Sequence, residues 1–251
     1  MNVFELNEGI YQAIVDGTLK GYLDYLDERK AKKKEMLVSG AYAWTKGNHI
    51  DDQVAKIGQS AGIDFTVEKA GYTWEYLQFT LNEEADTFML IVKNSRRIRQ
   101  TFDGVIKKEK NYLTDLADLN LPAFTETGLT LLEKTEQIEL ELNYPEEIKA
   151  IQEGRSLAVE HACSRFYIVT YEINEDTKII DSIHLMMPNS ETMSLVSIKD
   201  LSTYMTSSPY EITYEDVAII KEEKTTDQTI FSGEPNAFGL SVAVEIAEKE
   251  N

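Results

Sequence analysis

The sequence of 251 residues predicts an α+β protein. Apolar residues recur at helical spacing over residues 3–38, three strand-like runs follow one another between residues 65 and 93, and strand-like runs return after residue 137. We therefore expect N-terminal helices and a helix/three-strand/helix block, followed by a second, acidic α+β lobe with antiparallel strands. The predicted domains are 1–120 and 121–251, with the boundary near residues 121–135.

The first segment carries a helical pattern that glycines interrupt. Its apolar residues at helical spacing are Ile10, Ile14, Tyr22, Tyr25 and Leu26. Gly17 and Gly21 should divide the segment into two helices. The basic run at residues 29–34 suits a helix C-terminus, where cations are favoured. Asn48 is then expected to cap a short helix that ends near Gly62.

Three strands and a helix should follow this short helix. FTVEKAG from Phe65, TWEYLQFTL from Thr73 and TFMLIVK from Thr87 are strand-like, and the connectors between them are short enough for hairpins. The third run is almost wholly apolar, which is typical of a strand buried on both faces. The pattern after it predicts a helix from Ser95 to about Leu113.

The second half should open with a loop or linker that carries Pro122 and Gly128. An alternating strand over residues 137–143 and a helix with Pro145 at its first position are expected next. RFYIVTYEI and KIIDSIHLMM should then form a hairpin around NEDT, with ETMSLVSI as a third strand. Near the C-terminal end the pattern predicts strands over residues 217–220 and 240–246.

Composition and targeting signals favour a cytoplasmic globular protein. The chain is 42% hydrophobic and 27% charged, and no apolar run approaches the roughly 20 residues that a transmembrane helix needs. The N-terminal residues lack the basic and apolar regions of a signal peptide. The single Cys163 has no partner for an internal disulfide, which fits a reducing compartment.

The charge of −19 is unevenly distributed along the chain. Residues 1–120 hold 16 Lys/Arg and 19 Asp/Glu, whereas residues 121–251 hold 9 and 25. This asymmetry is typical either of an acidic surface that meets a basic partner, even as a nucleic-acid mimic, or simply of a protein kept soluble by its net charge.

Half of the six arginines are nevertheless gathered at Arg96, Arg97 and Arg99. On one helix from residue 95 to 113, this triplet would nearly superpose on Lys107, Lys108 and Lys110, because eleven residues make about three turns, and form a basic stripe roughly 16 Å long. With Lys93 these residues are the predicted anion- or partner-binding site. The stripe could contact an external anion, pair with the acidic second half, or stay a solvated face.

The order helix, three strands, helix over residues 48–112 resembles the restriction-endonuclease-like core. That resemblance implies an acid on the second strand and an acid-x-Lys on the third, which hold a divalent metal ion. Lys93 stands at the place of the lysine, but Ile91 stands where the acid belongs. Glu75 and the pair Asp51-Asp52 could only be outlying ligands.

Other catalytic motifs are lacking in the sequence. His49, His161 and His184 have no metal-ligand spacing, and Cys163 follows residues that are typical of packing. There is no phosphate-binding glycine loop, dinucleotide fingerprint or Gly-x-Ser-x-Gly. We expect no catalytic residue, no metal and no cofactor, and we favour a non-enzyme.

WTKGNHIDDQVAKIG and SRFYIVTYEINEDTKIIDSIHLMMP are similar to segments of uncharacterised proteins of Gram-positive bacteria and their phages. The similarity implies an accessory or host–virus conflict role. We therefore expect a non-catalytic acidic interaction protein of bacterial or phage type that binds a protein or nucleoprotein partner, in an inhibitory or anti-defence role, without contacting a membrane. The alternative is a nucleic-acid-binding protein or metal-dependent nuclease with a degraded restriction-endonuclease-like core.

Overall fold

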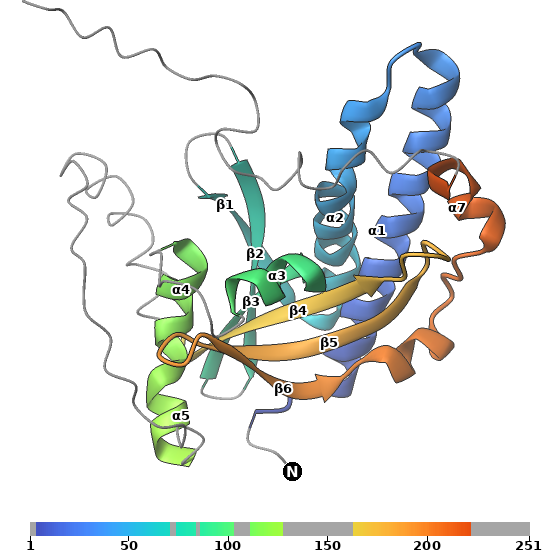
Figure 1. The fold of residues 1–251 in the computed structure, drawn as a ribbon. Helices are drawn as coiled ribbons and strands as arrows, with labels where there is room; N and C mark the ends of the chain where they lie inside the picture. Colours follow the sequence, from blue (N-terminus) through green and yellow to red (C-terminus); the bar gives the residue numbers. More distant parts are fainter. Residues whose placement is uncertain (1–3, 71–73, 84–85, 103–110, 128–162, 222–251) are drawn as a thin grey trace, which may run out of the picture.

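A computed structural model describes residues 4–70, 74–83, 86–102, 111–127 and 163–221, and confirms the α+β class. Its centre is a mixed six-stranded sheet whose strands lie in chain order, β1-β2-β3-β4-β5-β6 (Figure 1). The strands are β1 (Ile63–Ala70), β2 (Trp74–Glu83), β3 (Asp86–Asn94), β4 (Arg165–Ile173), β5 (Ile180–Asn189) and β6 (Ser194–Asp200). All neighbours are antiparallel except β3 and β4, which are parallel.

The parallel pair joins the two predicted lobes in one sheet. Phe88–Asn94 of β3 are in register with Arg165–Tyr171 of β4, so strands from before and after residue 121 are hydrogen-bonded neighbours. The change in composition near residues 121–135 is therefore not a boundary of the sheet. As predicted, β3 is buried on both faces, because Leu90 and Ile91, which point to opposite faces, are both fully buried.

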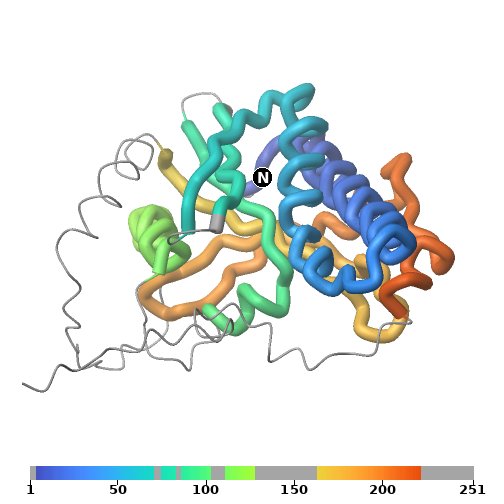
Figure 2. The backbone as a smooth tube through the Cα atoms, turned by 90° about the horizontal axis from the view of Figure 1, so that it is seen from above, coloured from blue at the N-terminus to red at the C-terminus, as the bar shows by residue number. Residues whose placement is uncertain are grey.

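Helices cover one face of the sheet with the larger apolar core. They are α1 (Glu8–Glu35), α2 (Lys46–Gly58) and α7 (Tyr214–Lys221), with the 3-10 helices η1 (Gly40–Thr45), η2 (Gln59–Ala61) and η4 (Ser202–Ser207). This core includes side chains of α1, α2 and α7 together with the alternate residues Phe88, Leu90 and Val92 of β3. Figure 2 shows α1 and α2 side by side, on the opposite side of the strands from α3.

The prediction that Gly17 and Gly21 divide the first segment was wrong, because α1 runs through both. A Cβ at Gly17 would lie 2.5 Å from Val54 Cα, and one at Gly21 would lie 2.4 Å from Ile50 Cα. The glycines therefore allow α1 and α2 to approach closely. Asn48 is likewise not the cap of α2, because the helix begins two residues earlier.

The other face carries short helices over the second core. They are α3 (Ser95–Thr101), α4 (Tyr112–Ala117) and the 3-10 helix η3 (Asp118–Asn120). The next helix, α5 (Leu121–Thr127), contributes its buried Phe124 to the first, larger core. The predicted helix from residue 95 to 113 was wrong, because α3 ends at Thr101 and Asn111 has an extended backbone that caps α4. The loop expected around Pro122 is the helix α5, for the described part of that segment.

The hairpin of β4 and β5 and the third strand β6 confirm the prediction for residues 165–200. The strand expected over residues 217–220 was wrong, because these residues belong to α7. The strands expected over 137–143 and 240–246 and the helix after Pro145 lie outside the described residues. Within the described part of the chain, no helix has the length and apolar character needed to cross a membrane.

Candidate anion-binding site

The arginines of α3 do not share one neighbour. Arg96 Nη1 donates to Glu175 Oε1 at 2.8 Å, and Arg99 Nη2 donates to Glu172 Oε2 at 3.0 Å. Both carboxylates belong to the hairpin of β4 and β5, which lies beside α3 because β4 pairs with β3. Two of the three arginines thus form ion pairs with the acidic second half. Each arginine side chain is 62% exposed, so each pair contributes little stability.

The basic stripe that the sequence predicted cannot form on one helix. It required α3 to continue to residue 113, whereas α3 ends after two turns at Thr101. Lys107, Lys108 and Lys110 lie outside the described residues, so the structure does not place them relative to the arginines.

Lys93, the last predicted member of the site, lies near the end of β3 and interacts electrostatically with Arg97. Its Nζ is 5.2 Å from the centre of the Tyr76 ring. Burial lowers the pKa of Lys93, the Asp51 carboxylate opposes this change, and the Arg97 guanidinium adds to it. Lys93 and Arg97 are thus two cations close enough to repel each other.

Strands β2 and β3 diverge at this point. Their pairing runs from Phe79 and Leu90 to Glu83 and Asp86, while residues 74–78 of β2 remain paired with β1. We call the gap between residues 74–78 and the end of β3 the fork. A backbone N–H that faces a gap needs another acceptor, and Asp51 Oδ2 of α2 accepts a hydrogen bond from Leu77 N at 3.3 Å.

Asp51 is the buried carboxyl group of the fork, with 7% of its surface exposed. Burial raises its pKa to about 6, although the nearby Lys93 and the Leu77 N–H lower it. Tyr112 of α4 closes the same region, with its ring centre 5.0 Å from that of Tyr76. Burial raises the pKa of Tyr112 to about 12, Arg97 opposes this shift and Asp51 adds to it. The fork therefore holds two cations, one weakly acidic carboxyl group and the Tyr112 phenol, which stays protonated.

The described residues of the fork do not reproduce the acid-x-Lys pattern of the restriction-endonuclease-like core. The element order of that core is present as α2, β1, β2, β3 and α3, but Ile91 is fully buried in the apolar core under α3 and α4. Glu75 is exposed, 3.9 Å from Lys69. Across the described ranges, no three His, Cys, Asp or Glu residues come close enough together to hold a metal ion.

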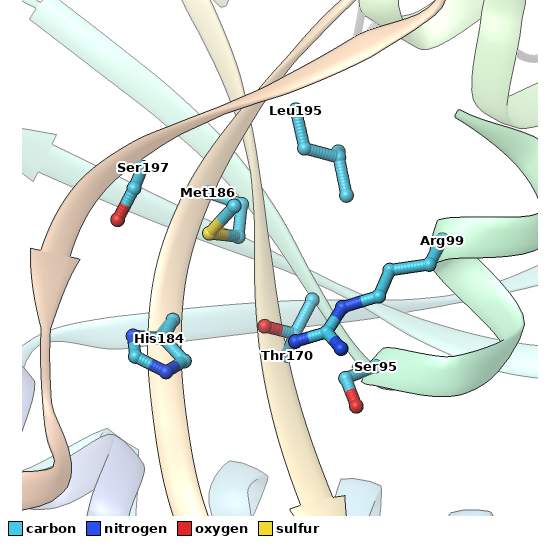
Figure 3. Close-up of a pocket in the computed structure, with 7 residues that line it drawn as sticks. All are labelled: Ser95, Arg99, Thr170, His184, Met186, Leu195 and Ser197. Carbon is cyan, nitrogen blue, oxygen red and sulfur yellow. The ribbon is translucent and has the colours of Figure 1, made fainter. Parts of the chain in front are cut away.

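A hollow lies beside the fork, on the face of the sheet that carries α3, between α3 and strands β4 to β6 (Figure 3). We call it the α3 hollow; its volume is about 150 Å³. Its lining residues are Ser95, Arg99, Thr170, His184, Met186, Leu195 and Ser197. Thr170 is in register with Lys93 on one side and with His184 on the other, so one cross-strand row connects the fork to the hollow.

Sequence reasoning missed the α3 hollow. It tested His184 only for metal-ligand spacing with other histidines, whereas its neighbours in space are Thr170 and Asp200 on adjacent strands. The predicted hairpin around NEDT gave no usable signal, because the simple register would place Thr170 opposite Asp181, whereas the longer turn and the register shift between Glu172 and Ile173 place it opposite His184. Cys163 is buried in the second core, where burial raises the pKa of its thiol and disfavours the reactive thiolate.

The chain was compared with protein-family models, with curated proteins and with solved structures, and none of them matched. The functional conclusion therefore depends on the chemistry of the described residues.

Proposed function

We propose that this chain is a non-catalytic, cytoplasmic interaction protein whose partner adds a strand to the β1 edge, residues 63–70. The observation that carries the proposal is the position and exposure of β1. It is the outer strand of the sheet, and among the described strands it pairs only with β2. An open edge strand offers backbone N–H and C=O groups that another chain can bind.

The side chains of the β1 edge support the same reading. Phe65 is 38% exposed and Val67 is 60% exposed, and as alternate residues they point to one face. Ile63, the previous residue on that face, is fully buried. An apolar strip thus runs along the edge strand from the buried Ile63 to the exposed Val67, where soluble proteins usually place charges.

Charge favours a basic partner segment. Asp64 and Glu68 lie on the other face of β1, and Glu75 is exposed on the neighbouring strand β2. The net charge of −19 attracts cationic partners at long range. We therefore expect an extended segment in which apolar residues that contact Phe65 and Val67 alternate with Lys or Arg.

The test is affinity capture from bacterial lysate with three baits: the wild type, Phe65→Lys/Val67→Lys, and Tyr214→Lys. Tyr214 is the matched control, because it is 66% exposed and apolar but belongs to α7. We expect one partner with the wild type and Tyr214→Lys but not with the double variant. Hydrogen exchange on the recovered complex should show protection of the β1 amides. Recovery of no partner, equal recovery by all baits, or protection elsewhere but not in β1 would reject the proposal.

Nucleic-acid binding is the second candidate, and the fork favours it. Lys93 and Arg97 together exceed the charge of Asp51, so an anionic group would lower their repulsion. Binding of labelled DNA and RNA should then fall steeply with salt and be lost in Lys93→Ala/Arg97→Ala. Lack of binding at low salt would exclude this candidate, and cleavage that needs Mg²⁺ would show that the protein is an enzyme.

A further inference from the structure

We propose that the α3 hollow binds the phosphate group of a small organic phosphate monoester. The hollow lies on the α3 face of the sheet, so this site is independent of partner binding at the β1 edge. It combines a cationic group, three hydroxyl groups and an apolar floor from four separate elements, α3, β4, β5 and β6. Ligand pockets typically combine an apolar lining with a few polar groups in this way.

Arg99 supplies the cationic group. Figure 3 shows its guanidinium extending from α3 over Thr170 and Ser95. Its Nη2 donates to Glu172, and a guanidinium carries five N–H donors, so further N–H groups remain for a ligand. Guanidinium groups match phosphate oxygens through two parallel hydrogen bonds.

The remaining donors favour phosphate over carboxylate. The hydroxyls of Ser95, Thr170 and Ser197 form no hydrogen bond with any other residue of the described ranges. His184 adds an imidazole N–H; its Nδ1 is 3.6 Å from Asp200 Oδ1. A carboxylate has two acceptor oxygens, whereas a phosphate monoester has three terminal oxygens that can engage donors from several sides.

The apolar lining and the volume of the hollow limit the size of the organic group that the phosphate can carry. Met186 of β5 and Leu195 of β6 supply apolar surface next to the donors. The volume of about 150 Å³ is well below the roughly 300–1,000 Å³ of pockets for larger ligands. The hollow therefore has room for one phosphate group and a short carbon chain.

The chain offers a matched pair of arginines for the test. Arg96 and Arg99 lie on the same helix, are each 62% exposed, and each pair with one glutamate of the same hairpin. Only Arg99 lines the hollow. Calorimetric and NMR titrations of the full chain should use glycerol 3-phosphate, inorganic phosphate, glycerol and acetate as probes.

We expect glycerol 3-phosphate to bind saturably and at least tenfold more tightly than glycerol or acetate, and more tightly than inorganic phosphate. Arg99→Gln should weaken this binding about tenfold or more, as the loss of a charge-assisted hydrogen bond predicts, whereas Arg96→Gln should leave it unchanged. Thr170→Val, which keeps the side-chain shape, should also weaken binding of glycerol 3-phosphate. The midpoint of its thermal unfolding should equal that of the wild type, which would show that the fold is intact.

Three results would overturn the proposal. Equal weakening by Arg96→Gln and Arg99→Gln would show a diffuse electrostatic attraction. Acetate or inorganic phosphate binding as tightly as glycerol 3-phosphate would reject the assigned ligand chemistry. The lack of a saturable shift at Thr170 or His184 in a titration to 50 mM, a concentration roughly 5 × 10⁴ times a micromolar Kd, would exclude the site.

Discussion

Gly21→Ala should destabilise the protein, although alanine is the better helix former. A Cβ at this position would lie 2.4 Å from Ile50 Cα, 2.5 Å from His49 O and 2.8 Å from Ile50 N. All three are backbone atoms of α2 that cannot rotate away. Ordinary contact begins near 3.4 Å, so the two helices must separate locally by about 1 Å.

The size of the effect follows from two opposed contributions. Overpacking costs about 1–3 kcal/mol, and a clash with backbone belongs at the upper end of that range. Replacing glycine in a helix interior returns about 1 kcal/mol. We expect a net loss of about 2 kcal/mol, which is a fall of about 0.7–1 M in the urea midpoint for a slope of 2–3 kcal/mol/M.

The assay is urea unfolding followed by circular dichroism, with Gly47→Ala as the control. Gly47 also lies in a helix, α2, but a Cβ there meets nothing within 4 Å. This control should be as stable as the wild type, or up to about 1 kcal/mol more stable. If Gly21→Ala were as stable as Gly47→Ala, the close contact between α1 and α2 would be refuted.

Further predictions concern buried polar groups and the α3 hollow. Asn120→Ala should cost about 2–4 kcal/mol in urea unfolding, because its amide makes three buried hydrogen bonds to Phe166 and Pro188; a loss below 1 kcal/mol would contradict this. The pKa of Asp51, raised from 3.8 to about 6, makes folding less favourable as the pH rises from about 4 to about 6, so Asp51→Asn should be more stable than the wild type at pH 7, by up to about 3 kcal/mol, and the difference should vanish below pH 4. A pH-independent difference would exclude Asp51 as the titrating group. Glu172→Gln should tighten glycerol 3-phosphate binding about two- to fivefold, since it removes the carboxylate that competes for the guanidinium; weaker binding would show that Glu172 positions it.

The strands could be predicted from sequence because their patterns are local. TFMLIVK is apolar on both faces, and the two runs around NEDT are rich in β-branched, aromatic and other apolar residues until a polar turn interrupts them. Helix ends were predicted less well, although two of them carry readable signals. Asn111 and Thr114 form a capping box at the start of α4, and Thr213 with Asp216 makes a similar local cap at α7.

The candidate site depends on contacts that no local pattern contains. Gly17 and Gly21 were predicted to break the helix, because the sequence does not show that α2 packs against α1 at these two positions. The α3 hollow likewise joins Arg99 to His184 on β5, and the sequence predicts neither the parallel pairing of β3 with β4 nor the end of α3 at Thr101. The resemblance in element order located Lys93 correctly at the end of the third strand, but its carboxyl neighbour is Asp51, which comes from a helix.

The asymmetry of charge along the chain is partly cancelled within the fold. Arg96 and Arg99 are three residues apart and lie on about the same side of α3, toward the β4–β5 hairpin, whereas Arg97 points about 100° away from Arg96 and acts on Lys93. Two of them meet glutamates of the acidic half, and Lys30 of α1 likewise pairs with Asp216 at 3.1 Å. Cations that already have carboxylate partners gain less from a polyanion, because binding must first break those pairs. This internal pairing weakens the case for an extended nucleic-acid surface and favours the two sites of the described chain that do not depend on a run of free cations, the β1 edge and the α3 hollow.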